Sequence, residues 1–516
     1  MKIKYIWLLL LFVGLVACDD DNDTITLPET VQLTAGSADF STYVSIGNSL
    51  TAGFTDNALF KASQENSFPN ILSQKFAYVG GGSFTQPLMN DNFGGISVGG
   101  NRILQPRLVT LGGAPLPLES VIGPVTVTTD LAVNNPTGPF NNMGVPGAAS
   151  FHLIYDGYGS MANLGTTANP YFIRMASASN ATVLGDALAQ APSFVSLWIG
   201  NNDVLGYATS GGSTGAITPQ GTFDFAISTI MGALQQANVQ GVMANIPYVE
   251  TTPHFTTVTY NPLDPENPDF GPQIPTLNAT FAALNGAFAF LGMPERSIVF
   301  SETEASAVVI HDESLANIQA QLFAVLVGGG LDAPTAGVLS AQFSQSRQAT
   351  ENDLLVLPSS SVIATVNIPY YTQLVTAGVP AATAGQLSVN GVTFPLADKW
   401  VLVPSEQVEI KAATDAFNAT LKAAADSAGF AFVDANALMQ ELSNGGIASG
   451  NYVLNSGLVT GGVFSLDGVH PNSRGYGLIS NEFLKAIDAT YGSNFEAAGM
   501  LSNVGDYPTN YSPLLQ

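Results

Sequence analysis

The residue types in this chain that could best do chemistry together are an aspartate and a histidine near the C-terminal end. Asp467 and His470 lie three residues apart, directly before Pro471. In a loop, this spacing can bring the carboxylate onto Nδ1 of the imidazole and leave Nε2 free to act as a base. The pair therefore predicts general acid–base chemistry, which also requires a nucleophile.

A serine at the end of an apolar run is the candidate nucleophile. Ser49 lies in Gly47-Asn48-Ser49-Leu50, which follows the run at residues 43–46. Parallel sheets present reacting groups beyond the carboxyl ends of their strands. Two further segments offer donors for a developing oxyanion: a backbone N–H at Gly147 and a side-chain amide at Asn202.

These four segments, in this order, resemble the GDSL/SGNH hydrolase family. The resemblance implies that Ser49 is the nucleophile and that His470, oriented by Asp467, is the general base and acid. It also implies an oxyanion hole made of the N–H groups of Ser49 and Gly147 and the amide of Asn202. The implied fold is a flavodoxin-like three-layer α/β/α sandwich with a mostly parallel sheet, and we expect no cofactor and no metal.

The chain departs from the family pattern at Asn48, where the name-giving motif has aspartate. That position is not one of the four catalytic positions of the family. We therefore expect altered hydrogen bonding near the serine rather than lost activity.

Short apolar runs predict the strands that position these residues. They cover residues 43–46, 194–199, 242–246 and 430–433. Nearly continuous apolar runs suit central parallel strands that are covered on both faces. Helical periodicity precedes the last two runs, at 227–234 and 410–424, with Ser405 as a plausible N-cap and Gly429 at the C-terminal stop. This alternation predicts an α/β sheet with crossover helices.

Long segments without a clear period lie between these units. We expect one hydrolase domain over residues 39–494, enlarged by insertions near 78–140 and 251–400, and a C-terminal tail at 495–516. The insertions are the segments expected to set substrate choice.

The overall composition excludes several classes of protein. The chain has 516 residues, a net charge of −25, 46% apolar residues, one cysteine and four histidines. This apolar fraction is not that of a disordered chain, and the acidic balance disfavours nucleic acid as a partner. A single cysteine can make neither an internal disulfide nor a cysteine-based zinc site.

That single cysteine ends an N-terminal segment typical of export. A basic start and an apolar run lead to Leu15-Val16-Ala17-Cys18, which resembles the lipobox of bacterial lipoproteins. The resemblance implies a signal peptide at 1–17, lipidation of Cys18, and an acidic tether at 18–38 like the export tract of Bacteroidetes surface lipoproteins. Processing removes two lysines and no acid, so the charge changes from −25 to about −27. We expect an outer-membrane lipoprotein that is exposed at the cell surface and bound to the membrane through this anchor.

Other candidate sites have simpler interpretations. Residues 211–215 match the G-x-S-x-G pattern by chance, because that motif works only on a strained elbow between strand and helix. His152, His254 and His311 are competing bases, but none has an aspartate at the Asp-x-x-His spacing. The acidic loop at 264–269 could hold calcium, although a solvated loop fits better because EF-hand spacing is absent.

The first functional hypothesis is a surface-anchored serine esterase that acts on acyl lipids or acylated small molecules. Deacetylation of carbohydrate is the alternative within the same chemistry. An alternative from another class is a non-catalytic binding lipoprotein on an SGNH scaffold. Retention of Ser49, Gly147, Asn202 and His470 together favours the enzyme.

Overall fold

A parallel five-stranded sheet lies at the centre of the computed structural model, which describes residues 31–516. Its strands are β1 (Tyr43–Gly47), β6 (Asn142–Gly144), β7 (Phe194–Trp198), β8 (Gln240–Ala244) and β13 (Ala431–Val433). They lie in the order β13-β8-β7-β1-β6, and every neighbouring pair is parallel. Counted along the chain, this is the order 5-4-3-1-2. The chain divides into residues 1–32 and 33–516, and the second unit holds the sheet.

The sheet confirms the α/β class and the four predicted strands. The sequence does not predict β6, because three residues of the type Asn-Met-Gly show neither alternation nor a β-branched run. Its register nevertheless places Gly144 opposite Gly47 at the end of β1.

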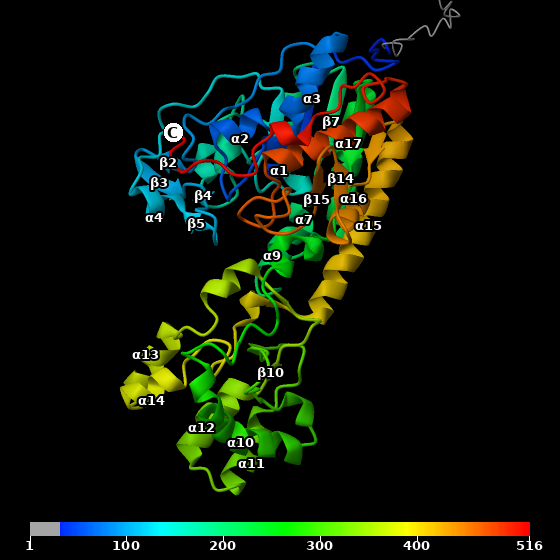
Figure 1. Cartoon of the computed structure of the whole chain (residues 1–516). Helices are drawn as coiled ribbons and strands as arrows, with labels where there is room; N and C mark the ends of the chain where they lie inside the picture. Colours follow the sequence, from blue (N-terminus) through cyan, green and yellow to red (C-terminus); the bar gives the residue numbers. More distant parts are fainter. Residues whose placement is uncertain (1–30) are drawn as a thin grey trace, which may run out of the picture. The chain divides into compact units, whose positions relative to one another are not determined.

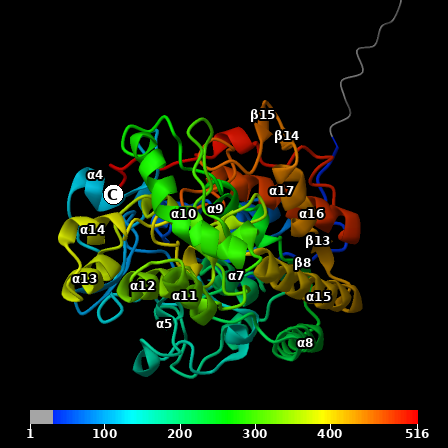
Figure 2. The same cartoon turned by 90° about the horizontal axis from the view of Figure 1, so that it is seen from below.

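Helices cover both faces of the sheet. Tyr43, Phe194 and Trp198 point to one face and pack with α3 (Phe68–Phe76) and α17 (Ser473–Tyr491). Their neighbours Val44 and Val195 point to the other face, which is covered by α6 (Val183–Leu188), α8 (Gln220–Gln236) and α15 (Pro404–Ala428). Figure 1 shows α3 and α17 beside β7, and Figure 2 shows α8 and α15 side by side. Burial on both faces explains why the strands read as continuous apolar runs.

The two predicted helices lie within α8 and α15, but the predicted N-cap is wrong. Helix α15 starts at Pro404, and the N–H of Val403 donates to the side chain of Glu406 at 2.9 Å, so Val403 rather than Ser405 is the N-cap. Pro is favoured at the first helical position because its missing N–H is not needed there. The helix ends as predicted at Gly429, whose φ of 66° is left-handed.

Shorter elements connect these layers. The helices are α1 (Ser49–Ala52), α2 (Lys61–Glu65), α4 (Leu118–Ile122), α5 (Pro170–Ile173), α7 (Asn202–Thr209), α9 (Pro253–Thr256) and α16 (Ala435–Ser443). The two-stranded sheets outside the second insertion pair β2 (Ile96–Val98) with β3 (Asn101–Leu104), β4 (Leu108–Val109) with β5 (Leu116–Pro117), and β14 (Ile447–Ser449) with β15 (Tyr452–Leu454). None of the helices within residues 31–516 is both long and apolar enough to cross a membrane.

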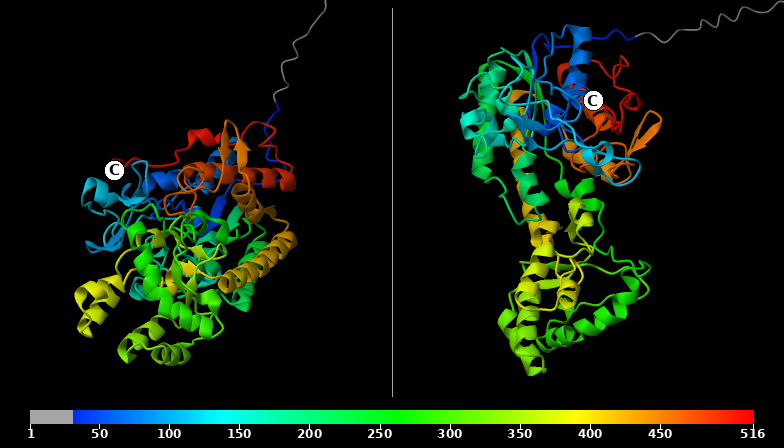
Figure 3. Two further views of the ribbon diagram at one scale, coloured as in Figure 1. Left: turned by 60° about the horizontal axis from the view of Figure 1, so that its bottom comes forward. Right: turned by 90° about the vertical axis from the view of Figure 1, so that its left-hand side faces the viewer.

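The segment that the sequence marks as the second insertion has a hydrophobic core of its own. Its helices are α10 (Ile274–Phe290), α11 (Gln319–Gly328), α12 (Ala333–Phe343), α13 (Ile368–Thr376) and α14 (Ala381–Gln386). Its strand pairs are β9 (Val309–His311) with β10 (Ser346–Gln348), and β11 (Leu354–Leu355) with β12 (Val401–Leu402). A cluster of buried side chains between Leu263 and Val403 joins these elements, and the green-to-yellow helices stay together in both views of Figure 3.

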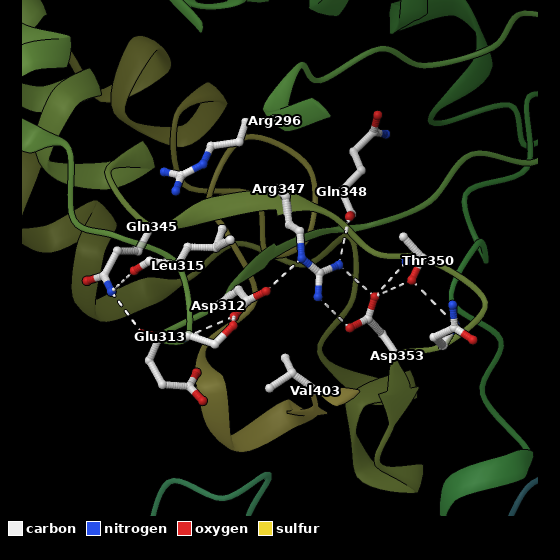
Figure 4. A network of polar contacts seen from close by, with 12 residues as sticks. Arg296, Asp312, Glu313, Leu315, Gln345, Arg347, Gln348, Thr350, Asp353 and Val403 are labelled. Atoms are coloured by element: carbon white, nitrogen blue, oxygen red, sulfur yellow. Dashed lines mark hydrogen bonds and ion pairs between the residues drawn. The ribbon is translucent and has the colours of Figure 1, made fainter. Parts of the chain in front are cut away.

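A buried network of ion pairs stabilises this second core. The guanidinium of Arg347 donates to Asp312 at 2.7 Å and to both carboxylate oxygens of Asp353 at 2.6 and 2.7 Å (Figure 4). The side chains of Asp312 and Asp353 are only 3% and 0% exposed. Planar, two-pronged contacts of this kind are stronger than single exposed ion pairs.

The first insertion and the C-terminal tail are joined by a buried arginine. Arg107 is fully buried and donates to the carbonyls of Asn92 and Ser512 at 2.8 and 2.6 Å. Tyr511 bonds to the carbonyl of Ala62 at 3.1 Å. Residues 495–516 therefore pack against the domain.

Candidate active site

Ser49 lies where β1 turns into α1. A Cβ at Gly47 would lie 2.3 Å from the carbonyl oxygen of Trp198, so only glycine lets β1 approach β7 this closely. Asn48 then caps the helix, because its Oδ1 accepts from the N–H of Leu50 at 3.0 Å. Ser49 is the first helical residue, so it stands at the carboxyl edge of the sheet, as the sequence predicts.

A chain of hydrogen bonds runs from Ser49 through His470 to Asp467. The Oγ of Ser49 lies 2.9 Å from Nε2 of His470, and Nδ1 of His470 lies 3.0 Å from Oδ2 of Asp467. The side chains of His470 and Asp467 are 15% and 9% exposed. The structure therefore brings the three residues together in the order that proton transfer from a serine to an oriented imidazole requires.

Asp467 is held as an anion. Burial alone would raise its pKa, but the imidazole of His470 and hydrogen bonds from backbone N–H groups outweigh burial and hold the pKa well below its usual range. The backbone donors are the N–H groups of Val469 and His470 to Oδ1, at 2.9 and 2.8 Å. The N–H of Asn57 donates to Oδ2 at 2.9 Å. An ionised, fully bonded carboxylate fixes the proton of the imidazole on Nδ1.

The candidate oxyanion donors come from the two neighbouring strands of the sheet. Asn202 starts α7 after β7, and its amide donates to the carbonyl of Ala148 at 2.9 Å, which leaves its second amide hydrogen available. Gly147 follows β6 with a φ of +83°. Within residues 31–516, no acceptor lies opposite the N–H of Ser49 or that of Gly147. Three hydrogen-bond donors are therefore available for a developing negative charge.

This position is the point at which the strand order reverses. The chain passes from β1 to β6 on one side and then to β7 on the other side of β1. Loops after strands on either side of such a point diverge and leave a crevice at the carboxyl edge. Ser49 after β1 and Asn202 after β7 lie at that crevice.

Asp203 ties the two donor loops together. Its carboxylate accepts from the hydroxyl and the N–H of Ser150 at 2.7 and 2.8 Å. Burial raises the pKa of Asp203, and the bonds from Ser150 oppose that shift. The aspartate thus has a structural role, because it links the loop at Ser150 to the start of α7.

The departure at Asn48 has a local explanation. The amide of Asn48 donates to Oδ1 of Asn201 at 2.9 Å. An aspartate could not make this donation. Asparagine at position 48 therefore links the turn after β1 to the turn after β7.

The other histidines have different surroundings. Nδ1 of His152 accepts from the N–H of Ala149 at 3.0 Å, and burial lowers the pKa of His152 to about 4. His311 lies in β9 of the second core. Of the imidazoles within residues 31–516, only that of His470 hydrogen-bonds to Ser49.

His254 lies against the loop that carries Asp467 and His470. Its backbone N–H donates to the carbonyl of Gly468 at 3.0 Å, and neither ring nitrogen has a partner within residues 31–516. Burial lowers the pKa of His254, and the nearby Asp467 opposes the shift. His254 supports the loop through its backbone N–H.

The sequence analysis missed two residues beneath the site, Asp56 and Asn57. Both have left-handed backbones, with φ of 52° and 62°. Oδ1 of Asp56 accepts from the N–H of Leu466 at 3.1 Å. Burial raises the pKa of Asp56 to about 7, with the bond from Leu466 opposing the shift and the charge of Asp467 adding to it. An Asp-Asn pair favours left-handed turns, and this was the available signal.

Ser49, Asn202 and His470 line a pocket with a cavity volume of about 90 Å³. This volume is below the range that is usual for sites of drug-sized ligands. Much of the remaining wall consists of apolar side chains from α16 and α17. A nucleophile, a base and an apolar pocket therefore occur together.

Acidic groups that could hold a metal ion lie elsewhere. Glu313, Asp398 and Glu406 are the one such group within residues 31–516, with ligand atoms within 4.8 Å of one another. The acidic loop considered for calcium instead binds its own backbone, since Asp264 accepts from the N–H of Glu266 at 2.8 Å. The chance G-x-S-x-G match lies in turns, with no strand leading into it.

Comparison of the chain with protein-family models, with curated proteins and with solved structures found no match. The predicted signal peptide, Cys18 and most of the predicted tether lie outside the described residues.

Proposed function

We propose that this protein is a serine ester hydrolase. The observation that carries the proposal is the hydrogen-bonded chain from Ser49 through His470 to Asp467 at the carboxyl edge of a parallel sheet. Within residues 31–516, the N–H groups of Ser49 and Gly147 have no acceptor, and together with the amide of Asn202 they could stabilise an oxyanion, which acyl transfer also requires.

The family assignment is part of the same proposal. The strand order, read from the other edge as 2-1-3-4-5, is that of flavodoxin-like sheets. Together with the four motifs in their order along the chain, it supports membership of the GDSL/SGNH hydrolases. The segments at 78–140 and 251–400 are then additions to the hydrolase domain.

The proposed reaction has two halves. Nε2 of His470 takes the hydroxyl proton of Ser49 while Oγ attacks the carbonyl carbon of the ester, and Asp467 stabilises the imidazolium that forms. The N–H groups of Ser49 and Gly147 and the amide of Asn202 bind the oxyanion. His470 then returns the proton to the departing alcohol, and a water molecule releases the acyl group from Ser49 in the same way.

Removal of the nucleophile tests this proposal. Ser49→Ala should lower kcat for p-nitrophenyl acetate or butyrate by about 10³-fold or more, because the remaining donors cannot replace the attacking oxygen. The matched control is Ser213→Ala in the chance G-x-S-x-G match, where the hydroxyl only donates to the carbonyl of Ser210 at 2.7 Å. This control should keep the wild-type rate.

Two results would contradict the proposal. Wild-type turnover by Ser49→Ala would show that another residue is the nucleophile. A wild-type protein that hydrolyses no ester from acetate to long acyl chains would favour the binding-lipoprotein alternative.

We also propose that the hydrolase is attached to the bacterial envelope through a lipid on Cys18. The sequence Leu15-Val16-Ala17-Cys18 supports this, as does the acidic stretch at 19–23 that follows it. An ester substrate would then be met at the cell surface.

A further inference from the structure

The second core contains a cavity that is much larger than the pocket beside Ser49. Its volume is about 790 Å³, whereas the pocket beside Ser49 has about 90 Å³. Helices α12 and α13, both labelled in Figure 1, and the segment at 394–398 contribute to its lining. The two cavities share no lining residue. A volume of this size is usual for small-molecule sites, so the second core offers a ligand site that is separate from the reacting serine.

Two aromatic rings stand in the wall of this cavity. The ring centroids of Tyr370 and Phe394 lie 4.4 Å apart, and the ring planes are inclined by 36°. The hydroxyl of Tyr370 donates to Oε1 of Gln342 at 2.8 Å, and the amide of Gln342 donates to the carbonyl of Thr393. These bonds join α12 and α13 to the segment that carries Phe394. Aromatic rings pack against apolar groups and also attract cations to their faces.

The charge in the lining of this cavity is negative. Asp398 is its acidic residue, its other titratable side chains are His311 and Tyr370, and neither lysine nor arginine contributes. Two further carboxyl groups, those of Glu313 and Glu406, lie next to Asp398, with ligand atoms within 4.8 Å of one another. A cation in the cavity is therefore attracted by the carboxyl groups at this end, and an anion is repelled.

These three carboxyl groups have no basic partner. None of the ion pairs within residues 31–516 includes any of them. Arg347 instead pairs with Asp312 and Asp353, and the carboxylate of Glu313 lies outside that network (Figure 4). Oδ1 of Asp398 is buried and has no hydrogen-bond partner in the same part of the chain. Buried negative charge without a counter-charge is unfavourable, and a bound cation would relieve this cost.

The pKa of Asp398 reflects this lack of positive charge. Burial raises it to about 7, and the adjacent Glu313 and Asp312 add to the shift. A cation held in the cavity would stabilise the ionised carboxylate of Asp398, so cavity and cation are complementary in charge.

We propose that this cavity binds an organic cation, an ammonium ion that carries an apolar body. The ammonium group pairs with Asp398, and the apolar body packs against Tyr370, Phe394 and Leu374. A bare metal ion would leave the aromatic and apolar wall unused, and a neutral apolar ligand would leave the carboxylate unpaired. The proposal is independent of ester hydrolysis, because the cavity contains none of the residues assigned to the reaction.

Probes that share a phenyl body and differ in charge test this proposal. The probes are the 2-phenylethylammonium ion, 2-phenylethanol and phenylacetate, each titrated into the purified protein by isothermal titration calorimetry at pH 8 and low salt. At this pH most of Asp398 is ionised. The cation should bind at least about tenfold more tightly than the neutral alcohol, and the anion more weakly than the alcohol, because Asp398 attracts only the cation.

Two variants separate the role of the carboxylate from that of the cavity. Asp398→Asn keeps the size of the side chain and removes its charge, so it should weaken binding of the cation about tenfold and leave binding of 2-phenylethanol unchanged. Ala341→Trp, in the part of the lining that α12 contributes, should weaken binding of both probes because the indole fills the cavity.

Glu351→Gln is the matched control. It removes the same charge from an exposed residue between β10 and β11 that does not line the cavity, so it should bind both probes as the wild type does. Thermal melts of all three variants show whether each is folded.

Each other result would overturn the proposal. Equal affinity for the cation and the alcohol would show that the cavity does not select charge, and no binding of any probe at millimolar concentration would show that it is not a site for such ligands. Wild-type affinity of a folded Asp398→Asn for the cation would show that the carboxylate is not its partner. Binding of calcium or magnesium ions without binding of the organic cation would assign the carboxyl groups to a metal ion instead.

Discussion

Asp467 is the residue whose surroundings are most specific. One carboxylate oxygen accepts two backbone N–H groups of its own loop, and the other accepts the N–H of Asn57 and faces Nδ1 of His470. Hydrogen-bond donors surround both carboxylate oxygens, so this position requires a side chain that accepts hydrogen bonds and donates none. Asp56, which lies just below, instead has its pKa raised to about 7 by burial. The surroundings thus shift the pKa values of these two neighbouring carboxyl groups in opposite directions.

This arrangement predicts the effect of Asp467→Asn. If the amide oxygen keeps the two bonds within the loop, the NH₂ group takes the place of Oδ2 and opposes Nδ1 of His470. The imidazole then carries its proton on Nε2 and cannot accept the proton of Ser49. We expect kcat for a short-chain ester to fall by roughly 10²- to 10⁴-fold.

The control is Asp332→Asn at the N-cap of α12, where asparagine caps equally well. Thermal melts of both variants would separate lost chemistry from lost folding. A near-wild-type kcat for Asp467→Asn in a folded protein would contradict the assigned role of the carboxylate.

At the scale of elements, the start of α15 brings together carboxyl groups from three segments. Glu406 in the first turn meets Asp398 and Glu313. Burial raises the pKa of Glu406 to about 8, with the bond from the Val403 N–H opposing the shift and the two neighbouring carboxylates adding to it. Folded protein therefore holds a proton here that the unfolded chain releases at lower pH.

The sign of the pH dependence follows from this difference. A pKa raised from 4.5 to about 8 makes the folded state bind more protons between these values, so stability falls as the pH rises from 5 to 8. Glu406→Gln stays neutral and keeps an oxygen for the Val403 N–H. We expect it to reduce the loss of stability over this range by about 1–3 kcal/mol.

Denaturant unfolding at several pH values measures this effect. Glu409→Gln, on the exposed side of the same helix, is the matched control and should follow the wild type. Equal loss of stability with pH in Glu406→Gln and the wild type would show that the cluster is not protonated in the folded state.

At the scale of the whole molecule, the reacting groups and the second core come from different parts of one chain. The sheet and its loops carry Ser49, Asn202 and His470, while the second core adds no side chain to the pocket beside them. Helix α9, which precedes the second core in the chain, contacts the site through its backbone, where the N–H of His254 donates to the carbonyl of Gly468. The fold can thus accommodate an insertion as large as the second core without displacement of the reacting groups.

The proposed envelope anchor is a property of the whole chain as well. Cys18→Ser should move the protein from the membrane fraction to the soluble fraction, because no other cysteine can be acylated. Ser49→Ala is the control and should remain with the membranes. A Cys18→Ser protein that still fractionates with membranes would contradict lipidation at this position.

The sequence by itself predicted four of the five strands of the sheet and parts of helices α8 and α15, and it singled out Ser49, Asp467, His470 and Asn202 as candidate site residues. Apolar runs, helical periodicity and short motifs are local patterns, and local patterns encode local structure. The Asp-x-x-His spacing is local too, so it singled out one histidine of four.

Only the tertiary structure decided how these pieces meet. The contact between Ser49 and His470 joins residues 421 positions apart, and no spacing encodes such a distance. Strand β6 forms because its neighbour β1 pairs with it, and Asp56 is linked to the loop before Asp467 by a hydrogen bond from the N–H of Leu466, 410 positions away. The apolar pocket likewise exists only where α16 and α17 pack beside Ser49, because its wall is formed by segments that are distant in the sequence.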